Sequence, residues 1–112
     1  MTDSRIPTEL WVKAHVHRLS AQGVPVVIAR RGDRHGGMVI LKINQLSEGC
    51  RVLAQTRDLD GNLAWLPALD GKTVPESEAD AWIGRQAGYD PDLWVVEVET
   101  RSGEHGFEGK VL

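Results

Sequence analysis

Apolar side chains recur at helical spacing in two segments of the chain. The first opens at Pro7 and Thr8 and closes at Gly23, and proline near the start with glycine past the end is typical of a helix. The second spans about residues 75–87, and Gly88 after it is expected to take the left-handed conformation of a helix end. Both segments predict amphipathic helices, whose apolar stripes comprise Trp11, Val12, His15, Val16 and Leu19 in the first and Ala79, Trp82, Ile83 and Ala87 in the second.

Five shorter segments have the apolar, β-branched composition of strands. The first is apolar on both faces, which predicts an interior strand, whereas Pro67 in the fourth indicates an edge or a bulge. In the last, Trp94, Val96 and Val98 alternate with glutamates and are expected to face the core. The five predicted strands are residues 24–31, 38–44, 51–57, 63–69 and 93–100.

The order of these elements is helix, four strands, helix, strand. Consecutive strands joined by short turns predict an α+β fold with a mainly antiparallel sheet of about five strands. We expect both helices to pack on one face of the sheet, which leaves the other face wet or paired with a partner. One domain is expected over residues 8–101, between a flexible N-terminus at 1–7 and a tail at 102–112 that is rich in glycine and charge and should fray.

Composition restricts the class of protein. The chain has 112 residues, of which 41% are hydrophobic, so it can form a core of its own. No apolar run approaches the roughly 18 residues of a membrane span, and no leader segment is visible at the N-terminus. The single cysteine, Cys50, cannot form an internal disulfide, which fits a reducing compartment. We therefore expect a cytoplasmic protein that does not enter a membrane.

Charge is divided unevenly along the chain, although the formal net charge is only −3. Residues 1–57 hold nine Lys and Arg against four Asp and Glu, a net of +5, whereas residues 58–112 hold four against twelve, a net of −8. Such a division is either balanced inside the fold, with basic strands beside acidic ones, or produces a dipolar surface that steers a charged partner or pairs two copies.

Three segments together resemble a known family. They are Arg30-Arg31-Gly32-Asp33 after an apolar strand, Arg85-Gln86 at the end of a helix, and Asp90-Pro91-Asp92-Leu93-Trp94-Val95-Val96-Glu97. Over about residues 8–104 the chain is similar to the bacterial domain-of-unknown-function family 1491. The resemblance implies a small single-domain bacterial protein, and because the family has no assigned activity it implies no catalytic or binding role for any residue.

The loop at residues 30–37 carries the densest group of candidate binding residues, namely Arg30, Arg31, Arg34 and His35. Guanidinium groups suit phosphate or carboxylate, and a hairpin of this kind could follow a nucleic-acid backbone. The spacing of its glycines is not that of a phosphate-binding P-loop. The alternative is a solvated turn whose arginines pair with Asp33 or with the acidic C-terminal half. The negative net charge of the chain does not support nucleic-acid binding.

No residue pattern indicates catalysis, a cofactor or a metal ion. His15 and His17 are two residues apart on a helix and point away from each other, so they cannot chelate one ion. His35 and His105 have no ligand at a recognisable spacing, and Cys50 has no base that the sequence places beside it. We therefore expect no catalytic, cofactor or metal site, which favours a protein that is not an enzyme. The alternative is an enzyme whose site is assembled from distant residues and leaves no local pattern.

Tryptophan is unusually abundant, with four residues against one Phe and one Tyr. Trp82 and Trp94 are expected in the core, while Trp11 and Trp65 are candidates for an exposed interface, unless all four are buried. Together with the divided charge, this favours a non-enzymatic cytoplasmic accessory protein that binds a protein partner or forms a homodimer. The alternative is binding of nucleic acid, phosphate or another anion through the loop at residues 30–37.

Overall fold

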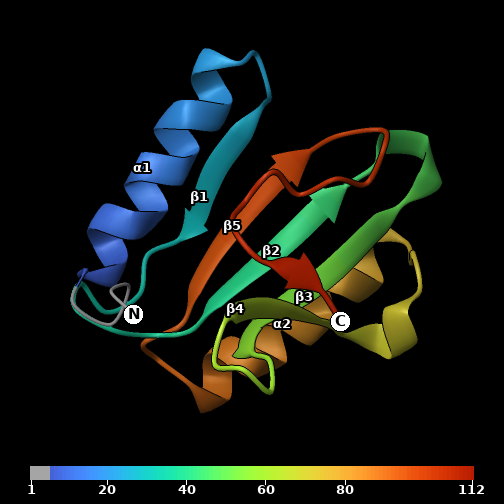
Figure 1. The fold of residues 1–112 in the computed structure, drawn as a ribbon. Helices are drawn as coiled ribbons and strands as arrows, with labels where there is room; N and C mark the ends of the chain where they lie inside the picture. The colour runs from blue at the N-terminus through green and yellow to red at the C-terminus, as the bar shows by residue number, and fades with distance from the viewer. Residues whose placement is uncertain (1–5) are drawn as a thin grey trace.

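The computed structural model describes residues 6–112. Residues 1–5, which belong to the N-terminal stretch predicted to be flexible, lie outside the described residues. Figure 1 shows a central sheet with helices on either side of it. In chain order the elements are α1 (Thr8–Ala21), β1 (Val26–Arg30), β2 (Val39–Asn44), the 3-10 turn η2 (Leu46–Glu48), β3 (Cys50–Arg57), β4 (Leu63–Pro67), the 3-10 turn η3 (Leu69–Gly71), α2 (Glu76–Tyr89), β5 (Trp94–Glu99) and β6 (Lys110–Val111).

The strands form a sheet in the order β1-β5-β2-β3-β4-β6, so the α+β class is confirmed with two helices. Within residues 6–112 the sheet has six strands rather than about five and is mixed rather than mainly antiparallel, because β5 runs parallel to β2 and β6 parallel to β4. The remaining pairs, β1/β5, β2/β3 and β3/β4, are antiparallel. After α2 the chain inserts β5 between β1 and β2, which makes β1 an edge strand. The prediction of an interior strand at residues 24–31 is therefore wrong, and the side chain of Val27 is 57% exposed.

The two helices cover opposite faces of the sheet, so the prediction that both pack on one face is wrong. In Figure 1, α2 lies behind the sheet and α1 lies beside β1 in front of it. The first five residues of β2 are all buried because each face of this central strand is covered. The α1 face holds Val12, Leu19, Val26, Val39, Leu41, Ile43, Leu53, Trp65, Trp94, Val96, Val98 and Phe107. The α2 face holds Ile40, Cys50, Val52, Val74, Ala79, Ile83, Leu93 and Val95.

Residues 102–112, called the C-terminal segment below, pack against the α1 face instead of fraying as predicted. Figure 1 shows this segment returning from β5 across the sheet toward β4. Phe107 is only 6% exposed, and the backbone N–H of Leu112 donates to the carbonyl of Trp65 at 2.9 Å. A glycine-rich composition suggested a mobile tail, but one buried aromatic side chain and strand pairing through β6 hold the segment in place.

The helix ends predicted from the sequence agree only in part with those in the structure. Gly23 has φ +83° just past the end of α1, as predicted for a glycine at that position. Gly88 instead lies inside α2, which continues to Tyr89, so the predicted end at about residue 87 is too early. Proline precedes the first residue of both helices, and neither N-terminus has a side-chain capping bond. The glycine signal therefore locates the end of α1 but not that of α2.

An ion cluster fastens α2 to the sheet. Lys42 of β2 is 7% exposed, and its Nζ lies 2.7 Å from carboxylate oxygens of both Glu76 and Asp80 on α2. Glu97 of β5 is 3.5 Å away and also accepts a hydrogen bond from Asn44. Burial lowers the pKa of Lys42, but hydrogen bonds to Asp80 and Glu76 outweigh this and raise the pKa above its ordinary value. The lysine is therefore charged and fully paired.

Candidate functional site

The loop between β1 and β2 is pressed against the segment that precedes β5. The backbone N–H of Asp33 donates to the carbonyl of Asp92 at 3.1 Å, and the indole Nε1 of Trp94 donates to the carbonyl of Asp33 at 2.8 Å. A Cβ atom on Gly32 would overlap the Asp92 carbonyl, so glycine is required for this approach. The two longest segments that carry the family resemblance thus lie in contact, although about 60 residues of chain separate them.

Two arginines of this loop share one carboxylate on α1. Arg31 forms a close ion pair with Glu9, and Nε of Arg34 lies 3.1 Å from the same carboxylate. Lys13 approaches it at 3.5 Å, so three cations surround a residue that is 8% exposed. Burial raises the pKa of Glu9, but the hydrogen bond from Arg34 and the charges of Lys13 and Arg31 lower it below its ordinary range.

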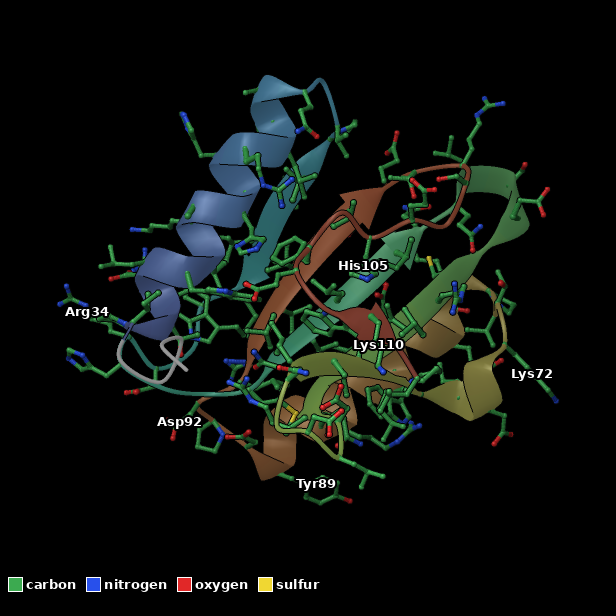
Figure 2. The ribbon with its side chains drawn as sticks, in the orientation of Figure 1. Arg34, Lys72, Tyr89, Asp92, His105 and Lys110 are labelled. Atoms are coloured by element: carbon green, nitrogen blue, oxygen red, sulfur yellow. The ribbon has the colours of Figure 1, made fainter. Side chains whose placement is uncertain are left out.

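Glu9 therefore replaces both acid partners that the sequence suggested for the arginines, Asp33 and the acidic C-terminal half. Asp33 instead accepts the backbone N–H groups of His35 at 3.2 Å and Gly36 at 2.8 Å, which fixes the turn. Figure 2 shows Arg34 on the outer side of the loop and Asp92 at the lower end of the sheet. The carboxylates of Glu9, Asp33 and Asp92 thus accompany the cations Arg31, Arg34 and Lys13 at this end of the molecule.

The four candidate residues of the loop do not converge on one point. Arg31 and Arg34 both form ion pairs with Glu9, while His35 lines a cleft on the α1 side of the sheet. Arg30 lies on the other side of the sheet, at a groove of about 220 Å³ that Lys42 and Asp80 also line. The guanidinium of Arg30 donates to the Arg31 carbonyl at 3.4 Å. Of these four candidates, the structure therefore brings together Arg31 and Arg34, and it places His35 and Arg30 at two separate hollows.

A cleft at the N-terminal end of α1 has a volume of about 380 Å³. Its walls come from α1, the loop, β3 and the start of β4. Among the described residues that line it none is acidic, and several carry hydrogen-bond donors. The lining residues are Ile6, Thr8, Trp11, His35, Gly36, Gln55, Thr56, Arg57 and Leu63.

Two polar residues of β3 are held in place at the cleft by the fold. The side-chain oxygen of Gln55 accepts the backbone N–H of Val39 at 3.0 Å, which leaves the NH₂ group of this amide as a donor. Arg57 donates to the carbonyl of Gly61 at 3.3 Å across the hairpin between β3 and β4. No local motif marks Thr8, Gln55, Thr56 or Arg57 as site residues, because the cleft joins positions almost 50 residues apart.

The two tryptophans considered as interface anchors have different positions. Trp65 is 0% exposed, and its Nε1 donates to the carbonyl of Glu108 at 2.8 Å, so the prediction of an exposed interface residue is wrong here. The short pairing of β6 covers the strand that Pro67 was expected to leave at an edge. Trp11 is half-buried, lies 5.7 Å from Phe107 between ring centroids, and lines the cleft. It is therefore the tryptophan with an accessible face at the candidate site.

Other reactive side chains do not add to this site. Within residues 6–112 no three His, Cys, Asp or Glu residues gather in a way that would hold a metal ion. Cys50 is buried on the α2 face, and burial raises the pKa of its thiol, which lowers its reactivity. Over the same residues, neither helix has the length and apolar character needed to cross a membrane.

A family model described as protein of unknown function, DUF1491, matches residues 6–108. The chain belongs to the DUF1491 family. It is similar to a DUF1491 protein from Caulobacter crescentus CB15 in a crystal structure, with 33% identity, a TM-score of 0.84 and coverage of 96% of this chain and 99% of that chain. A solution structure of a DUF1491 protein from the same organism gives 32% identity, a TM-score of 0.79 and coverage of 95% and 96%.

A third solved structure, of a protein from A. tumefaciens, shares the fold with 23% identity, a TM-score of 0.69 and coverage of 86% of each chain. No curated protein matches the chain. The match to DUF1491 confirms the resemblance inferred from the sequence, and it covers both the loop and the segment before β5. These relatives carry no stated activity, so the function of this DUF1491 protein has to be argued from its own cleft.

Proposed function

We propose that this DUF1491 protein is a cytoplasmic binding protein without catalytic activity, and that its cleft takes up a carboxylate carried on an apolar body. The observation that carries the proposal is the lining of the cleft, which combines hydrogen-bond donors and apolar walls with no acidic side chain among the described residues. Small-molecule sites in proteins are typically concave, largely apolar and equipped with a few converging polar groups.

The polar part of the cleft favours an anion. Arg57 supplies a permanent positive charge, His35 supplies an imidazole, and the amide of Gln55 supplies a donor. Among the described lining residues, Arg57 is the one with a guanidinium, and we propose a singly charged carboxylate rather than a doubly charged phosphate as its ligand.

The apolar part favours a ligand with a hydrophobic body. Trp11 and Leu63 form walls, and Ile6 is 43% exposed at the same place. A volume of about 380 Å³ lies within the range of roughly 300–1,000 Å³ that is usual for small-molecule pockets. The carboxylate has two possible sources, a free organic acid or an acidic group on a partner protein, and both present the same chemistry to the cleft.

The geometry of the loop supports nucleic-acid binding less well than its sequence does. Arg30 lies on the other side of the sheet, and Arg31 and Arg34 are already paired with Glu9. A protein that follows a phosphate backbone needs several free cations on one surface. The geometry instead concentrates donors in a hollow that suits one small group.

Matched ligands test the proposal directly. We expect phenylacetate to shift the backbone amide signals of cleft residues such as Thr8 and Thr56, while uncharged phenylacetamide leaves them unchanged. Arg57→Gln should weaken binding of phenylacetate by about tenfold, the value of a charge-assisted hydrogen bond. Arg85→Gln, an exposed position on α2, is the control and should bind as the wild type does.

Further arms separate the alternatives. A peptide that ends in a free phenylalanine carboxylate, compared with its amidated form, distinguishes a protein partner from a free acid. Phenyl phosphate tests the preference for one negative charge. Equal binding of phenylacetate and phenylacetamide, or of wild type and Arg57→Gln, would overturn the proposal. Binding of a labelled oligonucleotide that weakens steeply with salt would establish the nucleic-acid alternative in its place.

A further inference from the structure

The α2 side of β1 is not covered by α2. Figure 1 shows β1 at the outer edge of the sheet, with β5 as its one neighbour in the sheet. Val26 and Ile28 pack against the α1-face core, and because side chains alternate along a strand, Val27 between them points to the α2 side. Val27 is 57% exposed, and among the described residues the α2-face core contains no residue of β1. An apolar strand position is therefore open to solvent on this side.

A groove of about 220 Å³ lies beside this strand, between β1 and α2. Ala29 of β1 lines it, together with Ile83, Gly84 and Ala87 of α2. Gly84 is exposed, and a Cβ atom on it would meet nothing within 4 Å. The groove therefore has room for an apolar side chain from another molecule.

The charges at this groove are not matched within one chain. Lys42 faces three carboxylates, those of Glu76, Asp80 and Glu97. Arg30 lines the same groove, and among the described residues it forms no ion pair with a carboxylate. Its guanidinium donates only to a backbone carbonyl, at 3.4 Å. The surface thus carries an unpaired cation beside carboxylates that outnumber their own lysine.

A second copy of the chain offers the groups that this surface can receive. The exposed side chain of Val27 and the cation of Arg30 lie next to the groove, on the same side of the sheet. When two copies face each other about a two-fold axis, β1 of each lies over the groove of the other, and every contact occurs twice. Arg30 of each copy then faces Asp80 and Glu97 of the other. The surface is therefore self-complementary in shape and in charge.

Other occupants fit the same surface less well. An acidic partner is repelled by the carboxylates around Lys42, and a basic partner is repelled by Arg30. A purely apolar partner would cover Arg30 without giving it a counter-charge. Association of two copies compensates both signs of charge with one contact that is repeated by symmetry.

We infer that the chain forms a homodimer through the surface made by residues 27–30 of β1 and the groove beside α2. The interface lies on the opposite face of the sheet from the cleft, so it does not depend on the proposed function. Its apolar part is small, and we therefore expect a dimer that dissociates on dilution.

Sedimentation velocity of the full chain, from micromolar to millimolar concentration, tests the inference. We expect the wild type to pass from monomer to dimer over this range. Gly84→Leu should abolish the dimer because the new side chain fills the groove, and the fold should persist because leucine favours a helix more than glycine does. Glu78→Leu, exposed on the side of α2 away from the groove, is the matched control and should dimerise as the wild type does.

An exchange of charges distinguishes a contact between copies from a contact within one chain. Arg30→Glu and Asp80→Arg should each weaken dimerisation by about tenfold, because each places like charges opposite one another twice in the dimer. A mixture of the two variants should form a mixed dimer at about the affinity of the wild type, since both contacts then join opposite charges. Like charges remain together inside each variant chain, so this recovery has to come from the contact between copies.

Val27→Lys tests the apolar part of the interface and should also weaken dimerisation. Leu66→Lys is the matched control, because Leu66 is 53% exposed on β4, toward the other edge of the sheet. We expect this control to dimerise as the wild type does.

Two outcomes would overturn the inference. One is a wild-type chain that stays monomeric up to millimolar concentration. The other is a dimer that Gly84→Leu, Arg30→Glu and Val27→Lys all leave intact, because such a dimer uses another surface. Asp80 contacts Lys42, so if Asp80→Arg does not fold, the response to Val27→Lys decides in its place.

Discussion

The two faces of the sheet are closed in different ways. One helix covers the α2 face and is fastened through Lys42, and the groove that remains there has about 220 Å³. Three separate pieces cover the α1 face, namely α1, the loop between β1 and β2, and the C-terminal segment. The larger cleft, of about 380 Å³, lies at the N-terminal end of α1 beside this loop. A layer assembled from several pieces leaves a hollow at its joins, and here that hollow contains the candidate site.

The two faces also differ in the interactions that hold their covering layers on the sheet. The α2 layer depends on charge as well as apolar burial, because Lys42 contacts carboxylates of α2 and β5. The C-terminal part of the α1 layer depends on aromatic packing around Phe107. Substitutions that remove each support should therefore act differently on stability, on pH dependence and on the cleft.

Phe107→Ala should have the largest effect. The side chain is 6% exposed within the α1-face core, and truncation of a buried phenylalanine costs about 3–5 kcal/mol of unfolding free energy. Urea unfolding monitored by circular dichroism measures this loss. Leu59→Ala, at a fully exposed position in the hairpin between β3 and β4, is the control and should change stability little. A loss below 1 kcal/mol for Phe107→Ala would show that the segment contributes little to the α1 face.

Lys42→Met should cost about 2 kcal/mol of unfolding free energy at pH 7, because it leaves the facing carboxylates without their cation. The cost is smaller than for a fully buried pair, since the side chains of Glu76 and Asp80 are about half exposed to water. Because the folded state raises the pKa of Lys42, this contribution is fully present below about 10.5 and is lost as pH rises through the raised pKa. Urea unfolding across this pH range measures it.

Lys72→Met, at an exposed position before α2, is the matched control and should leave stability nearly unchanged. A variant Lys42→Met as stable as the wild type would show that apolar burial alone holds α2. The α2 face would then resemble the α1 face in its support, and the contrast between the two would be one of shape only.

Glu9→Gln should have the smallest effect. The folded state lowers the pKa of Glu9, so its contribution to stability is present above the ordinary value of about 4.5 and is lost as pH falls through the lowered pKa. The variant should unfold at lower urea than the wild type at pH 7, and the difference should vanish in strong acid. Glu78→Gln, exposed on α2, serves as the control. A difference that is independent of pH would show that Arg31 and Arg34 do not depend on this carboxylate.

Only separate parts of the candidate site could be predicted from the sequence. The loop at residues 30–37 and Trp11 were identified separately, one as an anion-binding candidate and the other as an interface candidate. The structure places His35 of the loop and Trp11 in the same cleft. Thr56 and Arg57 could not be found from the sequence, because nothing in a strand of alternating character indicates which distant helix end it will approach.

Local features of the chain determined the two helices and most of the strands, because helical spacing and alternation act over a few residues. The same local reading missed Phe107, since one apolar side chain among glycines and charges forms no periodic pattern. Tertiary structure decided the insertion of β5 between β1 and β2, the placement of the helices on opposite faces, and the docking of the C-terminal segment. Each of these depends on burying apolar surface between distant segments, and that free energy is a property of the assembled fold rather than of any single stretch of sequence.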